Sequence, residues 1–414
     1  MKTTLVAVSI AACCLLNCYS KLPTPIISGP DSGWVRAPVL FRALNPDGSP
    51  NRRQENWMWG DGKASSSGIH YYAAPGTYSI TCVTISVAGA PAPMLVSDPS
   101  KPCTLRILED TLVHPDSIVA TIATGPRVWD WACVLPDGSR LYVTNAAADS
   151  VSVIDAANNS VTASVAVPDS PTCCIASNSG QFVYVSCLAA QSVAVIDVGG
   201  DSVVRTISID GSPAQLAVLP SDSFLYVAHA DSPLVSVVGT GDDSVVARVA
   251  VTGTPTSIAV KPGGGYVYVT SETGNTITVI RTSDNAVVSS ASISGGPADA
   301  ELSPSGDTIY VCCPNGKNLV ILRSVDMSTI QNVSYDSLGF PNPRHAVLLP
   351  GAQCLYVTAT TAYSGPVIVR RSDNYLLRLT DIGKARMAVP SPDGSKVYVP
   401  STTGVIVLGL RPGR

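Results

Sequence analysis

A chain of 414 residues is long enough to bury a sizeable core and to form two or three domains. Only 14% of its residues are charged and the net charge is -4, which excludes a strongly basic nucleic-acid-binding protein and an acidic solvating tail. Hydrophobic residues make up 45% of the chain but aromatic residues only 6%, and 33 Gly and 32 Pro are spread along it. This composition predicts an all-β protein with an aliphatic core and many turns.

Residues 1–18 have the pattern of an export signal. Lys2 provides a minimal positive start, and the apolar run from Leu5 to Leu16 is too short to cross a bilayer as a helix. The following Asn17-Cys18 completes a resemblance to the bacterial lipobox, which implies that Cys18 becomes the lipidated first residue of the mature protein. Ordinary secretion is the alternative, because Asn17 replaces the usual small residue, and Ile10-Ala11-Ala12-Cys13 is a competing match with a shorter apolar run. We therefore expect an exported protein of the cell envelope or cell surface, attached to the membrane through a lipid anchor only, or otherwise periplasmic or secreted.

Residues 19–23 are expected to form a tether, and residues 24–108 contain short β-runs that predict a small β-sandwich. Three motifs in this segment resemble those of the PKD domain, an immunoglobulin-like sandwich: Trp57-Met58-Trp59-Gly60-Asp61-Gly62, His70-Tyr71-Tyr72 and Pro75-Gly76-Thr77-Tyr78. The resemblance implies that these residues are structural and that the domain is a spacer or adhesion module. Cys82 and Cys103 are candidates for a disulfide, since an exported chain permits one, with two buried thiols as the alternative.

The segment 109–414 is built from a repeat that contains the strand Leu141-Tyr142-Val143-Thr144-Asn145. The central tyrosine recurs at Tyr142, Tyr184, Tyr226, Tyr268, Tyr310, Tyr356 and Tyr398, at intervals of 42, 42, 42, 42, 46 and 42 residues. A fixed period of about 40–45 residues predicts a β-propeller with one four-stranded blade per repeat, so seven repeats predict seven blades. The repeat resembles the YVTN family of propeller repeats, which occurs in exported and surface-layer proteins.

The two ends of the repeat region predict how the propeller closes. A fourth-strand pattern, Ser117 to Ala123, precedes the first tyrosine strand, whereas the chain ends soon after a third strand, Val405 to Leu408. We therefore expect an N-terminal strand to complete the last blade and so to remove the open sheet edge.

The remaining cysteines give one further candidate bridge. Cys173 and Cys187 are expected nearly opposite each other on adjacent strands of one blade. The other propeller cysteines are expected to be buried as small hydrophobic residues. Since no pair has the spacing of a zinc site, we expect no metal and no cofactor, and no motif assigns a catalytic residue.

Positions that differ between repeats are free to carry function. Counting eleven and twelve residues back from each tyrosine reaches the start of the innermost strand, at one mouth of the central channel. The candidate ligand-binding residues there and nearby are Arg127, Asp130, Trp131, Asp299, Arg344, His345 and Arg386. Arginine with tryptophan and aspartate could hold an anionic or carbohydrate-like ligand, and a mouth that is merely polar and wet is the alternative. The loops after the tyrosine strands, with His229 and Glu272, are expected on the same face.

We therefore expect a monomeric, non-catalytic binding protein whose propeller face binds a protein or glycan partner at the cell surface. An alternative is a propeller enzyme, either a lactonase-type hydrolase or a dehydrogenase subunit, with its site at the channel mouth. Periplasmic nucleic-acid binding is a third possibility, against which the low positive charge counts. The sequence identifies neither the partner nor the ligand.

Overall fold

The structure is a computed structural model that describes residues 114–124, 131–335, 342–349, 354–359, 367–370, 375–378, 387–401 and 404–411. Between residues 26 and 108 it describes short strands together with Trp59 and Lys63. The chain divides into two compact units, Met1–Thr111 with Arg414 and Leu112–Gly413. Cys18 and the tether at residues 19–23 lie outside the described residues.

The described strands of the N-terminal unit form three sheets. The largest has the order β2-β10-β8-β5-β6, with β9 also paired to β8, and the two small sheets are β1-β4 and β3-β7. The strand bounds are β1 Ile26–Ser28, β2 Ser32–Trp34, β3 Pro38–Leu40, β4 Arg42–Leu44, β5 Gln54–Met58, β6 Ala64–Ser65, β7 Ile69–Tyr71, β8 Gly76–Ser86, β9 Leu95–Val96 and β10 Cys103–Leu108.

Two tryptophans at the end of β5 lie in the interior of this unit. Trp57 and Trp59 are fully buried and stacked, with ring centroids 5.4 Å apart, while Met58 between them is 38% exposed. This is the alternation that a strand imposes on successive side chains. In the neighbouring strands Cys103 lies opposite Ile80, and the side chain of Cys103 lies outside the described residues. The Cys82–Cys103 bridge therefore stays a prediction.

The second unit is a β-propeller. Its described residues form seven four-stranded antiparallel sheets, in which consecutive strands of the chain are neighbours except where β11 joins the last sheet. The strand bounds are β11 His114–Ile122, β12 Ala132–Val134, β13 Arg140–Asn145, β14 Ser150–Asp155, β15 Ser160–Ala166, β16 Pro171–Ala176, β17 Phe182–Cys187, β18 Ser192–Asp197, β19 Ser202–Ser208, β20 Pro213–Val218, β21 Phe224–His229, β22 Leu234–Gly239, β23 Ser244–Ala250, β24 Ser257–Val260, β25 Tyr266–Ser271, β26 Thr276–Arg281, β27 Ala286–Ser292, β28 Asp299–Leu302, β29 Thr308–Cys313, β30 Asn318–Arg323, β31 Thr329–Ser334, β32 Pro343–Leu348, β33 Cys354–Ala359, β34 Val367–Arg370, β35 Tyr375–Arg378, β36 Val389–Pro390, β37 Lys396–Ser401 and β38 Gly404–Arg411.

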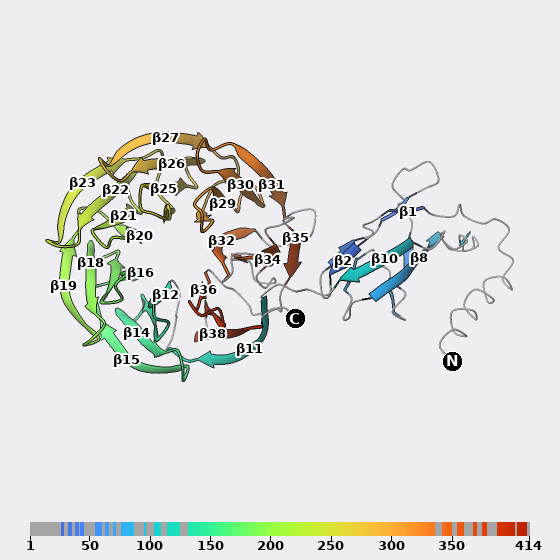
Figure 1. Ribbon diagram of the computed structural model, residues 1–414, viewed down its shortest axis with the longest axis horizontal. Coiled ribbons are helices and arrows are strands. Elements are labelled where there is room, and N and C mark those ends of the chain that lie inside the picture. The colour runs from blue at the N-terminus through green and yellow to red at the C-terminus, as the bar shows by residue number, and fades with distance from the viewer. Residues whose placement is uncertain are drawn as a thin grey trace. The chain divides into compact units, whose positions relative to one another are not determined.

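The innermost strands surround a central axis, and each contacts the innermost strand of the next sheet (Figure 1). The contacts run from β12 through β16, β20, β24, β28 and β32 to β36, which in turn contacts β12. The outer strands, such as β15, β19, β23 and β27, form the rim (Figure 1). The described residues contain no helix. No helix that could cross a membrane is therefore found among them.

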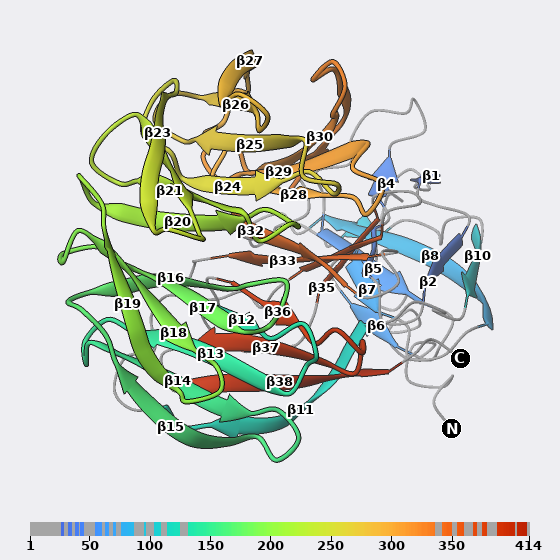
Figure 2. The ribbon, with the colours of Figure 1, turned by 60° about the vertical axis from the view of Figure 1, so that its left-hand side comes forward.

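The last sheet combines strands from both ends of the unit. β11 pairs antiparallel with β38, which continues through β37 to β36. In two views of the molecule, β11 and β38 lie side by side (Figures 1 and 2). The register places Ile122 opposite Val405 and Thr121 opposite Ile406. β11 therefore occupies the outer edge that the end of the chain leaves open, as the sequence pattern predicts.

The tyrosine strands are buried on both faces, because each sheet is packed between two neighbours. Tyr142 is fully buried as a residue, and its hydroxyl donates to Asp201 Oδ1 at 2.8 Å in the next sheet. Arg140 Nη1 donates to the same carboxyl group at 2.9 Å. Burial raises the pKa of Tyr142 well above its usual range, which keeps the hydroxyl protonated as a donor. Tyr142 thus joins adjacent sheets, as does Tyr226 by donating to Asn285 Oδ1 at 2.7 Å. The hydroxyls of Tyr356 and Tyr398, in contrast, have no hydrogen-bond partner among the described residues, so the repeated tyrosine is first of all a buried structural residue.

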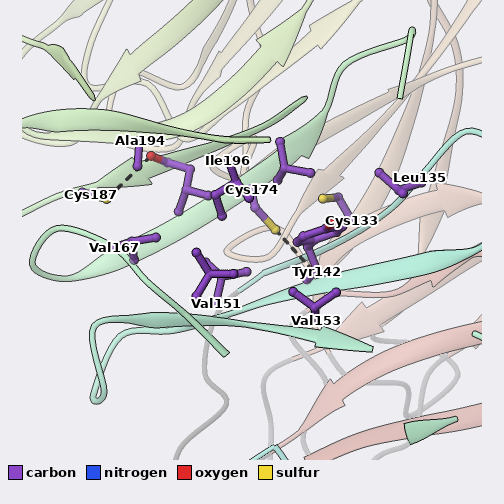
Figure 3. Packing of buried hydrophobic residues seen from close by; sticks show 13 residues of the cluster. Cys133, Leu135, Tyr142, Val151, Val153, Val167, Cys174, Cys187, Ala194 and Ile196 are labelled. Atoms are coloured by element: carbon purple, nitrogen blue, oxygen red, sulfur yellow. Dashed lines mark hydrogen bonds between the residues drawn. The ribbon is translucent and has the colours of Figure 1, made fainter. Parts of the chain in front are cut away.

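Cys173 and Cys187 are free thiols, so the candidate bridge between them is not formed. Cys187 packs in the cluster between the first two sheets together with Cys133, Cys174 and Val151 (Figure 3), whereas Cys173 packs in the cluster on the other face of its own sheet. The alternation of side chains across a strand gives the reason, because a register offset places the two thiols on opposite faces. The Cys174 thiol donates to the carbonyl oxygen of Tyr142 at 3.4 Å (Figure 3).

Candidate binding site in the central channel

The innermost strands line a cavity of about 500 Å³ along the axis of the propeller. All seven inner strands or their immediate ends contribute to its wall, from Trp131 just before β12 round to Met387 before β36. The wall is formed in layers, because residues at the same distance from each tyrosine lie at the same depth. Differences between repeats therefore decide the chemistry of each layer.

The layer at the mouth contains the residues eleven positions before each tyrosine. Ser257 Oγ donates to Asp299 Oδ1 at 2.7 Å, and the backbone N–H of Ala346 donates to Asp299 Oδ2 at 3.0 Å. His345 Nε2 lies 3.9 Å from the same oxygen. Asp299 is only 7% exposed, so this carboxyl group holds three consecutive sheets together at the edge of the cavity.

Trp131 contacts this cluster from the other side of the channel. Its indole lies edge-on to the His345 ring, with the ring centroids 5.4 Å apart, and it is half-buried in the cavity wall. The amide of Gln215 lines the same layer and accepts from the Cys173 thiol at 3.6 Å. The structure thus brings together three of the residues predicted from the sequence, Trp131, Asp299 and His345.

Arg344 points to a different partner from the one expected. Its Nη1 donates to Glu272 Oε2 at 2.6 Å, and Asn315 Nδ2 donates to the other oxygen of Glu272 at 3.3 Å. The loop that carries Glu272 therefore lies on the same face as the mouth, as predicted. Since Glu272 occupies the guanidinium, Arg344 is not available for an anionic ligand without breaking this ion pair.

Other predicted residues do not contribute to the described site. Arg127, Asp130 and Arg386 lie outside the described residues. His229 is fully buried, and its Nε2 forms a 2.8 Å hydrogen bond with Ser236 Oγ. Burial lowers the pKa of His229, so the ring is neutral near neutral pH. His229 ends β21 opposite Pro213 at the start of the inner strand β20, at the end of the sheet that faces the mouth, but its buried side chain is not available to a ligand.

A second layer, nine residues before each tyrosine, contains a residue that the sequence reasoning missed. Its members include Ile175, Ala259, Val347 and Val389, but in the fifth repeat the position is Glu301. Glu301 Oε1 accepts from the backbone N–H of Leu348 at 3.2 Å. Burial among these aliphatic side chains, together with the nearby Asp299 carboxyl, raises the pKa of Glu301 to about 8. Counting back nine residues instead of eleven would have revealed this single acid in an aliphatic layer.

The described residues contain no group of three or more His, Cys, Asp or Glu side chains arranged to hold a metal ion. The channel instead offers polar groups set among aliphatic side chains: the Trp131 and His345 rings, the amides of Gln215 and Asn178, the hydroxyls of Ser177 and Ser257, and the carboxyl groups of Asp299 and Glu301. Pockets with a few placed polar groups in an apolar wall are typical small-ligand sites.

Comparisons with known proteins agree with this architecture. Residues 116–224 match the family model described as YNCE-like beta-propeller. The chain is a β-propeller repeat protein. Among solved structures, it resembles Kuenenia stuttgartiensis Hydrazine Synthase with a TM-score of 0.60 and 21% identity, over 71% of this chain and 99% of that one. It also resembles the Myceliophteria_thermophila Cps50 (Swd1) beta-propeller domain with a TM-score of 0.61 and 14% identity, over 72% of this chain and 100% of that one.

Identities this low establish the shared fold and no more, because unrelated functions are carried by the same propeller scaffold. No curated protein matches the chain in sequence. Function must therefore be argued from the channel residues themselves.

Proposed function

We propose that this chain is an exported cell-surface protein that binds a glycan without catalysis, through the mouth of a propeller channel. In this proposal the seven sheets are the blades of one YVTN-type ring, and residues 24–108 are a PKD-like spacer. Cys18 carries a lipid anchor, and residues 19–23 form the tether. The partner is taken to be a neutral or weakly charged glycan, and a protein partner is the outcome that the binding test must distinguish.

The observation that carries the proposal is that Trp131, Asp299, Gln215 and Ser257 line the same end of one cavity, with Trp131 reaching the His345 ring from across the channel. A partly exposed indole gives a flat apolar surface for the face of a sugar ring. The Gln215 amide can donate to and accept from sugar hydroxyls, and the lone pairs that remain on the Ser257 and Asp299 oxygens can accept. The ion pair of Arg344 with Glu272 favours a polar neutral ligand over an anion.

Replacing Trp131 by alanine is expected to weaken glycan binding by about tenfold or more, since an aromatic ring at the centre of a site contributes roughly 1–3 kcal/mol. Binding would be measured on a glycan array and then by calorimetry with the glycans retained. Trp131→Phe should give an intermediate loss, because it keeps a smaller ring in the same wall.

The matched control is Tyr266→Ala. Tyr266 is a 37% exposed aromatic residue that begins β25, whereas the mouth residue Ser257 lies opposite Thr270 near the end of that strand. Tyr266 is therefore at the opposite end of the sheet, and its removal should leave binding unchanged. Equal losses in both variants, or glycan binding that survives Trp131→Ala in a folded protein, would refute the proposed site.

The lipid anchor has its own test. Cys18→Ala is expected to move the protein from the membrane fraction to the soluble fraction of the envelope, because a chain without the cysteine cannot be lipidated there. Fractionation with immunodetection measures the distribution, and a control variant, Cys13→Ala, should remain with the membrane. Membrane retention of the Cys18→Ala protein would contradict a lipid anchor at this position.

One observation favours a second candidate, a propeller enzyme. The pKa of Glu301, raised to about 8, is suited to acid–base chemistry near neutral pH, and Asp299 lies two residues away on the same strand. The two candidates differ in a direct measurement. A binding protein returns its glycan unchanged after prolonged incubation, as read by mass spectrometry, whereas an enzyme releases a product.

A further inference from the structure

The channel below the mouth contains a single acid in an aliphatic layer. The seven equivalent residues are Cys133, Ile175, Ala217, Ala259, Glu301, Val347 and Val389. An aliphatic residue would satisfy the packing at this position, as it does in most repeats. Burying a carboxyl group there carries a free-energy cost that a valine would avoid, so the acid is expected to serve a ligand.

The hydrogen bonds of Glu301 leave part of its carboxyl group open to the channel. Oε1 accepts from the N–H of Leu348, and Oε2 has no hydrogen-bond partner among the described residues. In contrast, both oxygens of Asp299 are occupied, by Ser257 and by Ala346. Glu301 therefore presents the acceptor that is free for a ligand inside the cavity.

The surroundings of this acceptor suit a cation on an apolar stem. Among the described residues that line the cavity there is no Lys or Arg. Ile175, Ala259 and Val347 would surround methylene groups, and the Trp131 ring at the mouth can attract a cation through its π-system.

We propose that the channel is a binding site for a primary ammonium group, which enters past Trp131 and pairs with the Glu301 carboxylate. The inference deepens the proposed function and rests on it, because the ammonium would belong to the ligand received at the mouth. The same chemistry is found in a free alkylamine, an amino sugar and a lysine side chain, and the experiment separates these sources.

A divalent metal ion fits this geometry less well. Calcium and magnesium ions require about six or more oxygen ligands, whereas most of the carboxyl oxygens here already accept hydrogen bonds from the protein. An ammonium group needs only a few acceptors and tolerates an apolar wall around its stem.

Binding should be coupled to loss of a proton from Glu301. Near pH 7 this carboxyl group is mostly protonated, because its pKa is raised to about 8, and an ammonium ion favours the ionised form. The other titratable groups around it are Asp299 on the same strand, Cys312 and Tyr310 on β29, and His345 on β32. Affinity should therefore rise with pH up to about 8, and fall again where the amine itself deprotonates near pH 10.

The test compares butylammonium with butanol, its neutral counterpart, by calorimetry on the full chain at about pH 8. The amine is expected to bind and the alcohol to bind at least about tenfold more weakly. Glu301→Gln, which keeps the acceptor for Leu348, should weaken amine binding by about tenfold or more. The matched control is Asp242→Asn, which removes the same charge from an exposed turn and should change affinity by less than about twofold.

Two further arms complete the test. At about pH 7, buffers of different ionisation enthalpy should report close to one proton released per amine bound in the original protein, and none in Glu301→Gln. Glucosamine against N-acetylglucosamine, and Nα-acetyl-lysine amide against its norleucine counterpart, show whether a sugar or a peptide carries the amine. Equal binding of amine and alcohol, no effect of Glu301→Gln, or no proton release would each overturn the inference. If the ammonium site fails but neutral glycans still bind, and their binding still requires Trp131, the proposed function stands.

Discussion

Replacing Gly404 by alanine is expected to lower the free energy of unfolding of the propeller by about 3 kcal/mol, which is large for the addition of one methyl group. Gly404 begins β38 with φ +134°, a conformation that side chains resist. A Cβ atom there would overlap the carbonyl oxygen of Ile122 at the end of β11. The substitution thus forces apart the two strands that complete the last sheet.

The measurement is the urea unfolding midpoint, combined with hydrogen exchange of the β11 and β38 amides. Exchange should accelerate at these strands first, since their pairing is strained while the other sheets are intact. Gly241→Ala is the control, because nothing lies within 4 Å of its Cβ position. A stability loss below about 0.5 kcal/mol for Gly404→Ala, similar to that of the control, would contradict the close approach of β11 and β38.

Replacing Glu301 by glutamine is expected to stabilise the protein increasingly as the pH rises from about 5 to about 8. In the folded state burial raises the pKa of Glu301 from 4.5 to about 8. Between these values the folded chain keeps a proton that the unfolded chain has lost, so unfolding releases a proton and stability falls with rising pH. One pKa unit corresponds to about 1.4 kcal/mol, so the shift from 4.5 to about 8 corresponds to about 5 kcal/mol of unfolding free energy over the whole pH range. Glutamine cannot ionise and escapes this loss.

The measurement is the difference in unfolding free energy between Glu301→Gln and the original protein across this pH range, in which the contributions of other groups cancel. Asp242→Asn is the control, because the pKa of Asp242 is shifted in the opposite direction to that of Glu301. Hydrogen bonds from Ser244 lower the pKa of Asp242, so this carboxylate stabilises the fold above its unfolded pKa, and its loss should give no gain at high pH. If the difference in unfolding free energy between Glu301→Gln and the original protein does not change with pH, the raised pKa of Glu301 is contradicted.

The fold was predictable because its signal is repeated. A tyrosine flanked by apolar residues every 42 residues requires a strand buried on both faces, and four strands per period follow from propeller geometry. The pairing of β11 with β38 followed from counting which strand each end of the chain lacks. These inferences depend on backbone pattern alone.

The site was predictable only in part, because side-chain contacts depend on which face each residue occupies and on the neighbouring sheet. Asp299, His345 and Trp131 are brought together as expected. Arg344 is instead paired with Glu272, which lies 72 residues earlier in the chain. His229 fills a buried polar position, and Cys173 and Cys187 are separated by the register of their strands. No repeat pattern encodes these contacts between sheets.

Glu301 shows a different limit. The residues at the start of each inner strand do not predict it, because Glu301 lies two residues further along its strand, deeper in the channel. An acid among Ile175, Ala259 and Val347 is unusual only when the repeats are aligned at that depth. The structure adds the reason that it matters, because these side chains surround one cavity.

The most direct test of the channel site is the ionisation of Glu301 itself. The chain has only four glutamates, Glu55, Glu109, Glu272 and Glu301, so carboxyl-labelled glutamate should give four carbon-13 signals, one of which disappears in Glu301→Gln. We predict that the Glu301 signal titrates with a midpoint of about 8 in the free protein and at lower pH with butylammonium bound. A midpoint near the ordinary value of 4.5 that the amine leaves unchanged would contradict the account of this channel.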